Sequence, residues 1–436
     1  MALLNQYERF LNGLPAAWER KRVSELGKVV GGGTPSRDVK AFWNGPLPWL
    51  TPGEVSDGKS KFLSDTRDTI SHAGLSSSGA NLLPPSSLMV TTRATLGARA
   101  INAVPMATNQ GFRSIVFKKG ESADFYFYLI EMMKSELKRR ASGTVFLEIS
   151  GGEFGRIQVP SPPADEKRAI ATILGTLDTA IQKTEAIVEK LKQVKQGLPH
   201  DLLTRGIDVN GELRPLQSEA PHLYKQSTLG WVPKEWVPTT LDSLVAKDRP
   251  IVYGILMPGY GEDSGIPVIK VKDIVEGFIN QSNLLLTTPA IDREYRRSRL
   301  QAGDLLFTIR GTVGRTAFVP PQLDAANITQ DTARISLVES DSTFIREWLG
   351  ACLARAFVNV HTIGVAVRGI NLRDVRRIPI LRPPLAEARG IGDRMRAAES
   401  RVYTEQARLA KLELVRKGIM EDLFSGRIPV TPALST

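Results

Sequence analysis

The sequence predicts a mixed α/β protein that consists of two copies of one module, each followed by a long helix. Three observations predict this fold: a repeat spaced by half the chain, short β-like runs separated by Gly and Pro in each copy, and two long stretches of helical periodicity. At 436 residues the chain has room for two domains of ordinary size, each with its own buried core.

The repeat is clearest near the end of each half. LKQVKQGLPHDLLTRGI, which starts at Leu191, is matched by LELVRKGIMEDLFSGRI, which starts at Leu412, so the offset is 412 − 191 = 221 residues. Residues 14–18 (LPAAW) likewise match 232–236 (VPKEW), and 93–97 (RATLG) match 310–314 (RGTVG). Solenoid and propeller repeats have periods of roughly 20–50 residues, so this spacing indicates a duplicated domain.

Each half reads as a globular module followed by a helix. β-like runs such as SIVF and DLLF alternate with helical patches such as DFYFYLIEMMKSELKRR and STFIREWLGACLARAF, which favours mixed α/β over all-β. We therefore expect a first module at 1–160, a long helix at 161–206, a connector at 207–231, a second module at 232–381 and a second long helix at 382–430.

Both long helices carry one apolar stripe, or seam, at alternating spacings of four and three residues. The seam residues are Ile170, Leu174, Leu177, Ile181, Val188 and Leu191 in the first helix, and Ile391, Met395, Val402, Leu409, Leu412 and Ile419 in the second. Both seams are interrupted at equivalent steps, at Thr184 and Glu405 and again at Lys195 and Arg416. Such a seam predicts that the two helices pack on each other; the alternative is that each helix only covers its own module.

Acidic residues after the Pro-Pro pairs at 162–163 and 383–384 predict the helix starts, and Gly206 and Gly426 predict the ends. Pro199 should end or kink the first helix near 196–198. Residues 165–197 would then form a rod of about 50 Å.

The chain is basic, with 57 Lys and Arg against 46 Asp and Glu, a net charge of +11 and a pI near 9.7. This balance indicates a polyanionic partner, with nucleic acid as the first candidate, although a basic protein without such a partner is the simpler alternative. Cys352 is the only cysteine and the four histidines are scattered, so we expect neither disulfides nor a metal site. The sequence has no signal peptide or membrane-length apolar stretch, which predicts a cytoplasmic protein without membrane contact.

DNA is read by Arg, Lys, Asn or Gln at base edges, and further basic groups contact the phosphates. The candidate DNA-binding residues are Arg93, Arg99, Asn109, Gln110 and Arg113 in the first module, and Arg293, Arg296, Arg297, Arg299, Arg310, Arg315, Gln330 and Arg368 in the second.

Two of these groups allow a structural alternative. The repeated Arg-x-Thr-x-Gly either places Arg93 and Arg310 against DNA or, as we favour, forms a turn in which Gly97 and Gly314 adopt positive φ. In the latter case the arginines are exposed or paired with an acid. The cluster DREYRRSRL, from Asp292, is either an edge that contacts phosphates or a solvated helix face.

These features resemble the specificity subunit of type I restriction–modification systems. GGTPSRDVKAFWNGPLPWLTPGEV, from Gly32, is similar to the opening of that family's target recognition domain. PSPPADEKRAIATILGTLDTAIQKTEAIVEKLKQVKQGLPHDLLTRGI is similar to its central helical region, although Glu166-Lys167 and Glu387-Ala388 replace the usual Glu-Gln. The resemblance covers nearly the whole chain.

The resemblance implies two α/β target recognition domains in pseudo-twofold arrangement, separated by two long helices that form an antiparallel coiled coil. Each domain would read half of a bipartite, asymmetric site on double-stranded DNA, and the helices would fix the spacer and dock two methylation subunits. Those partners bind S-adenosylmethionine, restriction subunits join them, and this chain would bind no cofactor and have no catalytic residues.

Two other functions remain open. A self-contained DNA methyltransferase needs an [Asp/Asn]-Pro-Pro-[Tyr/Phe] loop, and none of the Pro-Pro pairs has these neighbours. The glycine run at 31–33 is a weak cofactor-loop signal, because TPS follows it as a turn. A basic coiled-coil scaffold would explain the helices but leaves the duplicated modules without a role.

Overall fold

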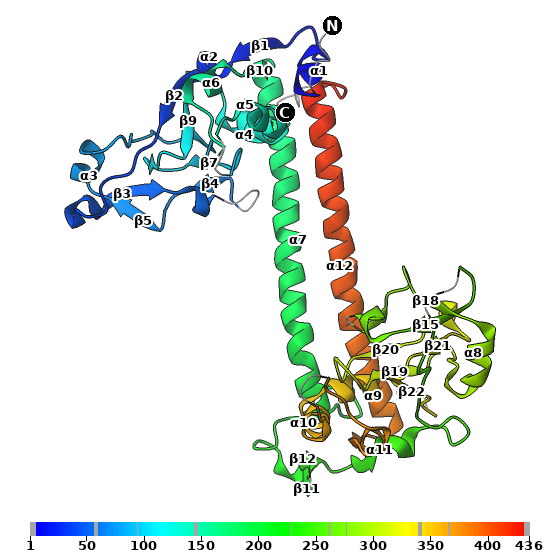
Figure 1. Cartoon of the computed structure of the whole chain (residues 1–436). Helices are drawn as coiled ribbons and strands as arrows, with labels where there is room; N and C mark the ends of the chain where they lie inside the picture. Colours follow the sequence, from blue (N-terminus) through cyan, green and yellow to red (C-terminus); the bar gives the residue numbers. More distant parts are fainter. Residues whose placement is uncertain are drawn as a thin grey trace. The chain divides into compact units, whose positions relative to one another are not determined.

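The structure is a computed structural model that describes residues 6–55, 60–93, 95–143, 147–227, 229–259, 261, 263–275, 277–338, 342–364 and 367–430. The chain forms two compact units, residues 1–187 with 406–436 and residues 188–405. Each unit contains one module together with part of helix α7 (Ala164–Thr204) and part of helix α12 (Leu385–Ser425), the two long helices in Figure 1.

Among the described residues, the first unit holds a five-stranded sheet, a three-stranded sheet and a strand pair. The larger sheet has the order β2 (Gly27–Gly31), β9 (Phe112–Phe117), β6 (Leu88–Thr91), β7 (Arg99–Asn102) and β4 (Phe62–Leu63). The smaller sheet is β5 (Asp68–Ile70), β3 (Trp43–Leu50) and β8 (Ala107–Thr108), and the pair is β1 (Glu19–Arg22) with β10 (Gln158–Ser161).

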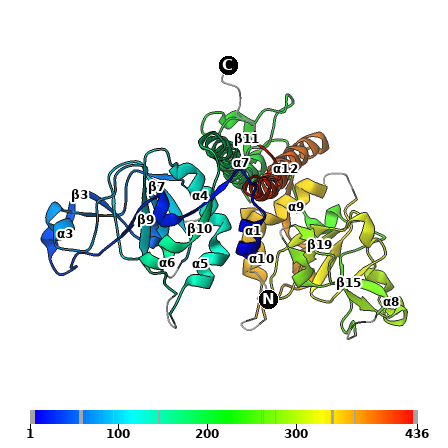
Figure 2. The same ribbon diagram turned by 90° about the horizontal axis from the view of Figure 1, so that it is seen from above.

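The helices of the first module cover this framework and join it to the long helices. They are α1 (Gln6–Asn12), α2 (Val23–Leu26), α3 (His72–Ser76), α4 (Ala123–Met132), α5 (Lys134–Arg140) and α6 (Gly151–Arg156), with 3-10 turns at Lys40–Phe42 and Pro52–Glu54. Helix α4 lies between the larger sheet and α7 (Figures 1 and 2).

The second unit repeats this framework in its described residues. A four-stranded sheet has the order β14 (Val252–Tyr253), β22 (Thr332–Ile335), β19 (Leu305–Thr308) and β20 (Thr316–Phe318). Beside it are β18 (Leu285–Thr287), β15 (Ile266–Ile269) and β21 (Asn327–Ile328), and the pairs β13 (Val237–Thr240) with β23 (Pro379–Arg382), β16 (Ile274–Val275) with β17 (Phe278–Ile279), and β11 (Tyr224–Ser227) with β12 (Gly230–Pro233).

The second module's helices are α8 (Pro289–Glu294), α9 (Ser342–Gly350), α10 (Cys352–His361) and α11 (Leu372–Arg376). Its 3-10 turns lie at Pro221–Leu223, Leu241–Leu244, Val271–Asp273, Arg296–Ser298 and Pro321–Leu323. Both modules share the antiparallel order β9-β6-β7 or β22-β19-β20 and one parallel pair, β3 with β8 or β15 with β21. The common topology confirms the predicted α/β fold and the duplication.

The apolar faces of the long helices contact the modules as well as the other long helix. In the first unit Ile170 and Leu174 of α7 and Phe424 of α12 share one core with Phe125 of α4, and the rings of Phe125 and Phe424 are 5.2 Å apart. In the second unit the core likewise combines residues of both helices with the module. Every predicted seam residue is buried or half-buried. Each helix therefore packs on its module and on its partner helix.

The two basic interruptions of the seam, Lys195 and Arg416, form cross-helix ion pairs. Nε of Arg416 lies 2.6 Å from Asp178 in the first unit, and Nζ of Lys195 lies 2.9 Å from Glu399 in the second. These pairs are equivalent in the repeat, because 399 − 178 and 416 − 195 both equal 221. Arg416 also contacts Glu131 of α4 at 3.1 Å, so it joins three helices.

Pro199 does not end the first helix near 196–198, which was one of its two predicted effects; the other, a kink, stays a prediction. Helix α7 continues to Thr204 with Pro199 inside it, which gives a helix of 41 residues, about 60 Å long. A proline inside a helix costs about 3 kcal/mol, but Leu202 and Leu203 beyond it are buried in the core of the second module. Burying each leucine contributes roughly 1.5–3 kcal/mol, which offsets the cost of the proline. Gly206 and Gly426 follow the helices with φ of 65° and 68°, as predicted for helix ends.

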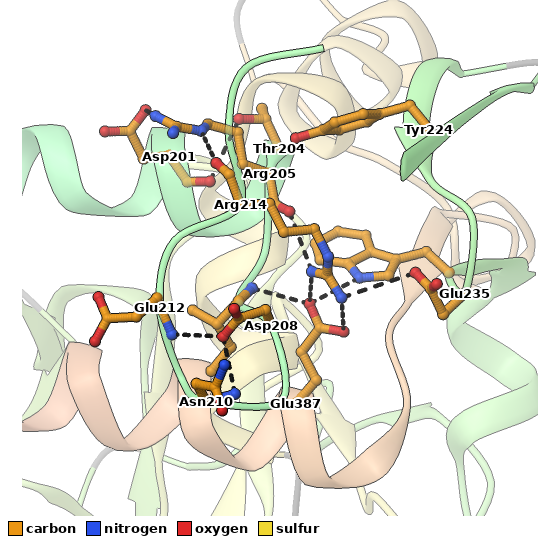
Figure 3. A network of polar contacts seen from close by, with 12 residues as sticks. Asp201, Thr204, Arg205, Asp208, Asn210, Glu212, Arg214, Tyr224, Glu235 and Glu387 are labelled. Atoms are coloured by element: carbon orange, nitrogen blue, oxygen red, sulfur yellow. Dashed lines mark hydrogen bonds and ion pairs between the residues drawn. The ribbon is translucent and has the colours of Figure 1, made fainter. Parts of the chain in front are cut away.

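The repeated tryptophan of each module binds the acid in the first turn of the next long helix. Nε1 of Trp18 donates to Glu166 at 2.9 Å, and Nε1 of Trp236 donates to Glu387 at 3.0 Å. Glu387 additionally holds the connector, since it accepts from the backbone N–H of Ile207 and from the guanidinium of Arg214 (Figure 3). The connector is thus ordered around a nearly buried carboxylate.

Candidate nucleic-acid interface

The repeated Arg-x-Thr-x-Gly forms the same turn at the end of a central strand in each module. The side-chain oxygen of Thr91 accepts from the N–H of Ala98 at 3.0 Å, and that of Thr308 accepts from the N–H of Arg315 at 2.9 Å. Gly97 and Gly314 have φ of 84° and 92°, which confirms the predicted left-handed conformation. Ala94, inside the first copy, lies outside the described residues.

The arginines of the two turns are exposed and each lies near an acid. Nε of Arg93 is 3.7 Å from Glu148, and Nε of Arg310 is 3.9 Å from Asp331. These distances are too long for strong ion pairs, and both side chains stay accessible. The predicted turn is present and leaves both arginines accessible, so their contact with DNA stays a prediction.

In the second module this turn lines an open cleft of about 530 Å³. Its lining includes Arg310, Gln330 and Asn371 as hydrogen-bonding groups and the exposed apolar side chains of Tyr253, Leu256 and Ile363. Donors and acceptors of this kind, surrounded by apolar groups, match the edges of bases and the thymine methyl group. Arg368 is exposed on the segment that carries the lining residues Val367 and Gly369.

The DREYRRSRL segment forms α8 and a 3-10 turn, and its arginines differ in role. Arg299 binds the buried carboxylate of Asp292, whose other oxygen accepts from Asn327 at 2.9 Å. Arg299 therefore has a structural partner, although its side chain stays 46% exposed, and its place in the DNA-binding set stays a prediction. Arg296 and Arg297 are exposed, and the 3-10 turn that holds them contacts β14, the strand of Tyr253 in the cleft.

The buried side chain of Arg334 binds the backbone of the 3-10 turn that carries Arg296 and Arg297. One nitrogen of Arg334 donates to the carbonyls of Arg297 at 2.9 Å and Arg299 at 3.2 Å, and the other donates to Pro250 at 3.0 Å. Burial, with a smaller contribution from the nearby charge of Arg249, lowers the pKa of Arg334. A guanidinium that binds three carbonyls fixes the backbone of the turn and adds positive charge beneath it.

Arg99, by contrast with Arg299, is buried, which contradicts its predicted contact with DNA. Its side chain is 4% exposed, donates to the carbonyl of Phe127 and binds Glu131 at 2.8 Å, so it joins the sheet to α4. Burial alone would raise the pKa of Glu131, but bonds and charges from Arg416 and Arg99 outweigh it and lower the pKa. A cation committed in this way cannot reach DNA.

The remaining candidates lie near the repeated turns. Arg113 donates to the backbone of Gln110 and to Glu148 at 3.4 Å, while the side chain of Gln110 accepts from Thr34. Asn109 turns its side-chain oxygen back onto the N–H of Gly111, so that oxygen shapes a loop. Arg315 of the second module is exposed and donates to the carbonyl of Ile274 at 3.0 Å.

The glycine run at 31–33 is explained by close backbone packing. A Cβ on Gly32 would lie 2.0 Å from the carbonyl oxygen of Asn109, and one on Gly33 would lie 2.3 Å from the backbone of Gly79. The run ends β2 and does not open a helix, which removes the geometric basis for a cofactor loop.

Three relevant residues were not singled out from the sequence. Glu148 and Gly369 lie opposite Arg93 and Arg310 in equivalent antiparallel bridges, and Asn371 caps α11 at the edge of the cleft. The 221-residue offset relates Glu148 to Gly369, so the repeat could have located this position. Among the described residues, no group of three or more His, Cys, Asp and Glu side chains is placed to hold a metal, and no described helix could cross a membrane.

The fold defines a protein with two related α/β modules, each packed on parts of two long helices. Comparison with known proteins identifies the class further, because residues 15–193 match the type I restriction modification DNA specificity domain. The chain has the sequence pattern and fold of a type I restriction–modification specificity subunit.

The similarity extends over the whole chain. It is 23% identical to the MjaIX specificity subunit of Methanocaldococcus jannaschii, over 97% of this chain and 96% of that protein. It is 25% identical to the EcoBI specificity subunit of Escherichia coli, over 70% and 65% of the two chains. The crystal structure of the S subunit from M. genitalium aligns with a TM-score of 0.55 at 12% identity, over 95% of this chain and 97% of that one.

A structure from work on complex assembly and conformational transition of the type I restriction–modification system aligns with a TM-score of 0.57 at 16% identity, over 95% and 99% of the chains. At these identities the structural matches establish the fold. Neither a self-contained methyltransferase nor a scaffold is favoured by these similarities.

Proposed function

We propose that each unit of this specificity subunit contacts one half of a bipartite, asymmetric site on double-stranded DNA. The observation that carries this proposal is the cleft of the second module, where Arg310, Gln330 and Asn371 line an open surface next to the unpaired, exposed Arg296 and Arg297 of the described chain. Hydrogen-bonding groups in the cleft would read base edges, and the neighbouring arginines would hold phosphates.

The chain would act without catalytic residues or a cofactor of its own. Two methylation subunits that bind S-adenosylmethionine would dock on the long helices, and restriction subunits would join them. Exposed apolar side chains on these helices, namely Ile187 and Val194 of α7 and Tyr403 and Leu414 of α12, would be accessible to such a partner.

Replacing Arg296 and Arg297 with alanine tests the phosphate contacts. Each lost contact should lower the slope of log K against log[salt] by about 0.9, so the double variant should lose roughly 1.8 in slope and bind all sequences more weakly. The measurement is DNA binding by the complex with the methylation subunit over a range of salt concentrations.

Arg299→Ala is the matched control, because Arg299 belongs to the same segment but is bound to Asp292. It should leave the slope nearly unchanged while lowering the melting temperature. An unchanged slope in the double variant would remove Arg296 and Arg297 from the interface, and binding without any sequence preference would favour the scaffold.

A further inference from the structure

The two modules present the same arginine at the same strand end but place a different residue opposite it. Arg93 forms an antiparallel bridge with Glu148, and Arg310 forms the equivalent bridge with Gly369. The flanking hydrogen bonds also match: Glu148 exchanges two backbone bonds with Ser142, of 2.9 and 3.0 Å, and Gly369 exchanges two of 2.9 Å with Ile363. The backbone frame is therefore shared, and the residue opposite the arginine is a variable position within it.

In the first module the residue opposite the arginine, Glu148, carries a negative charge. Glu148 lies 3.7 Å from Arg93 and 3.4 Å from Arg113, so one carboxylate faces two guanidinium groups at an accessible surface. Both ion pairs are partly exposed, which leaves the carboxylate oxygens able to accept from a ligand. A carboxylate accepts from the N4 amine of cytosine and is repelled by the acceptor edge of guanine.

In the second module the position carries no side chain and the arginine faces an open cleft. In the described part of the chain, Arg310 lies 3.9 Å from Asp331 and lines the cleft. An arginine that is free to use two donors matches guanine O6 and N7. An acid therefore lies near the arginine in both modules, but only the first module places that acid across the bridge, at the shared backbone position.

We propose that the residues at 148 and 369 determine base preference, because they decide whether a carboxylate lies across the bridge from the shared arginine. Glu148 directs its module toward a base with an exocyclic amine, and Gly369 leaves the cleft beside Arg310 without a carboxylate at this position, so that Arg310 can read guanine. This inference rests on the proposed function and deepens it by naming one reading position in each module.

The structure permits a reciprocal test because Gly369 has room for a side chain. A Cβ there would lie 3.4 Å from the carbonyl oxygen of Ile309 and 3.8 Å from Cγ of Arg310, which are ordinary contacts, and its φ is not in the left-handed region. Gly369→Glu would place a carboxylate near Arg310, and Gly369→Gln adds the same bulk without charge. Glu148→Gln removes the charge of the first module and keeps the shape.

The experiment is selection from randomised duplex DNA by the complex with the methylation subunit. Gly369→Glu should lose about tenfold or more of the preference at one guanine of one half-site, while Gly369→Gln keeps that preference. Glu148→Gln should relax one position in the other half-site only. Melting temperatures of the variants verify that they are folded.

Three results would overturn the inference: equal effects of Gly369→Glu and Gly369→Gln, unchanged motifs in both charge variants, or changes in the same half-site. A wild-type complex that selects no bipartite motif would instead overturn the proposed function, and this inference with it.

Discussion

Arg416 offers the sharpest test of how the long helices are held, because the repeat supplies its own control. Arg416 and Lys195 occupy equivalent positions and pair with the equivalent acids Asp178 and Glu399. The side chain of Arg416 is 16% exposed and contacts two carboxylates, whereas that of Lys195 is 46% exposed and contacts one. Replacing each with methionine keeps the apolar stem and removes the charge.

The two substitutions should differ in cost. Breaking a buried ion pair costs about 3–5 kcal/mol, and partial exposure of Asp178 and Glu131 places Arg416→Met near the lower end, at about 3 kcal/mol. Solvent screens the more exposed Lys195, so Lys195→Met should cost less than about 1 kcal/mol. If the stability of the first unit falls by about 3 kcal/mol, local opening of its helices becomes on the order of 100-fold more frequent.

Hydrogen exchange reports the local stability of each unit separately, whereas one melting curve of a two-unit chain does not. Amides of α4 and the adjacent part of α7 should exchange about 100-fold faster in Arg416→Met and be nearly unchanged in Lys195→Met. Equal, small effects of both variants would refute the reasoning that burial decides the strength of these pairs.

Three further outcomes are expected. Glu387→Gln should leave the buried guanidinium of Arg214 without a full counter-charge and raise exchange in the connector around Ile207, whereas Glu19→Gln, on an exposed side chain, should change nothing there. Gly197→Ala should stabilise the second unit by about 0.5–1 kcal/mol, because a Cβ there meets no atom within 4 Å. Gly206→Ala should destabilise this unit, because its Cβ would lie 2.2 Å from Glu387 and its φ of 65° is left-handed. Chemical denaturation of the two variants compares these effects. Glu131 has a lowered pKa in the fold, so its stabilisation is present above the unfolded pKa of about 4.3 and is lost as pH falls through the folded pKa. The difference in amide protection of α4 between wild type and Glu131→Gln should therefore shrink below about pH 4.3, and a constant difference would contradict this.

Local patterns in the sequence predicted the framework well where one physical effect dominates. The seam at spacings of four and three gave the long helices, and the left-handed glycines at 97 and 314 followed from the turn that the repeat shares. The helix does not end at Pro199 because the cost of a proline is local, whereas the burial of Leu202 and Leu203 that offsets it is a tertiary effect.

The interface was only partly predictable. Exposed arginines in a basic chain all qualify as candidates, and a sequence does not say which of them is already bound. Arg99 and Arg299 have the same chemistry as Arg297, but acids far away or on a neighbouring turn engage them. Glu148 and Gly369 were missed because their importance lies in the residue that faces them across a bridge.

The sequence alone determined that this protein is a duplicated α/β module with two long helices and a basic surface, because repeats, periodicity and charge are properties of the chain itself. The tertiary structure alone decided which charges are committed and which are free. The physical reason is that the availability of a side chain depends on burial and on partners distant in sequence, such as Glu131 for Arg99 and Glu387 for Arg214, which only folding brings within hydrogen-bonding distance.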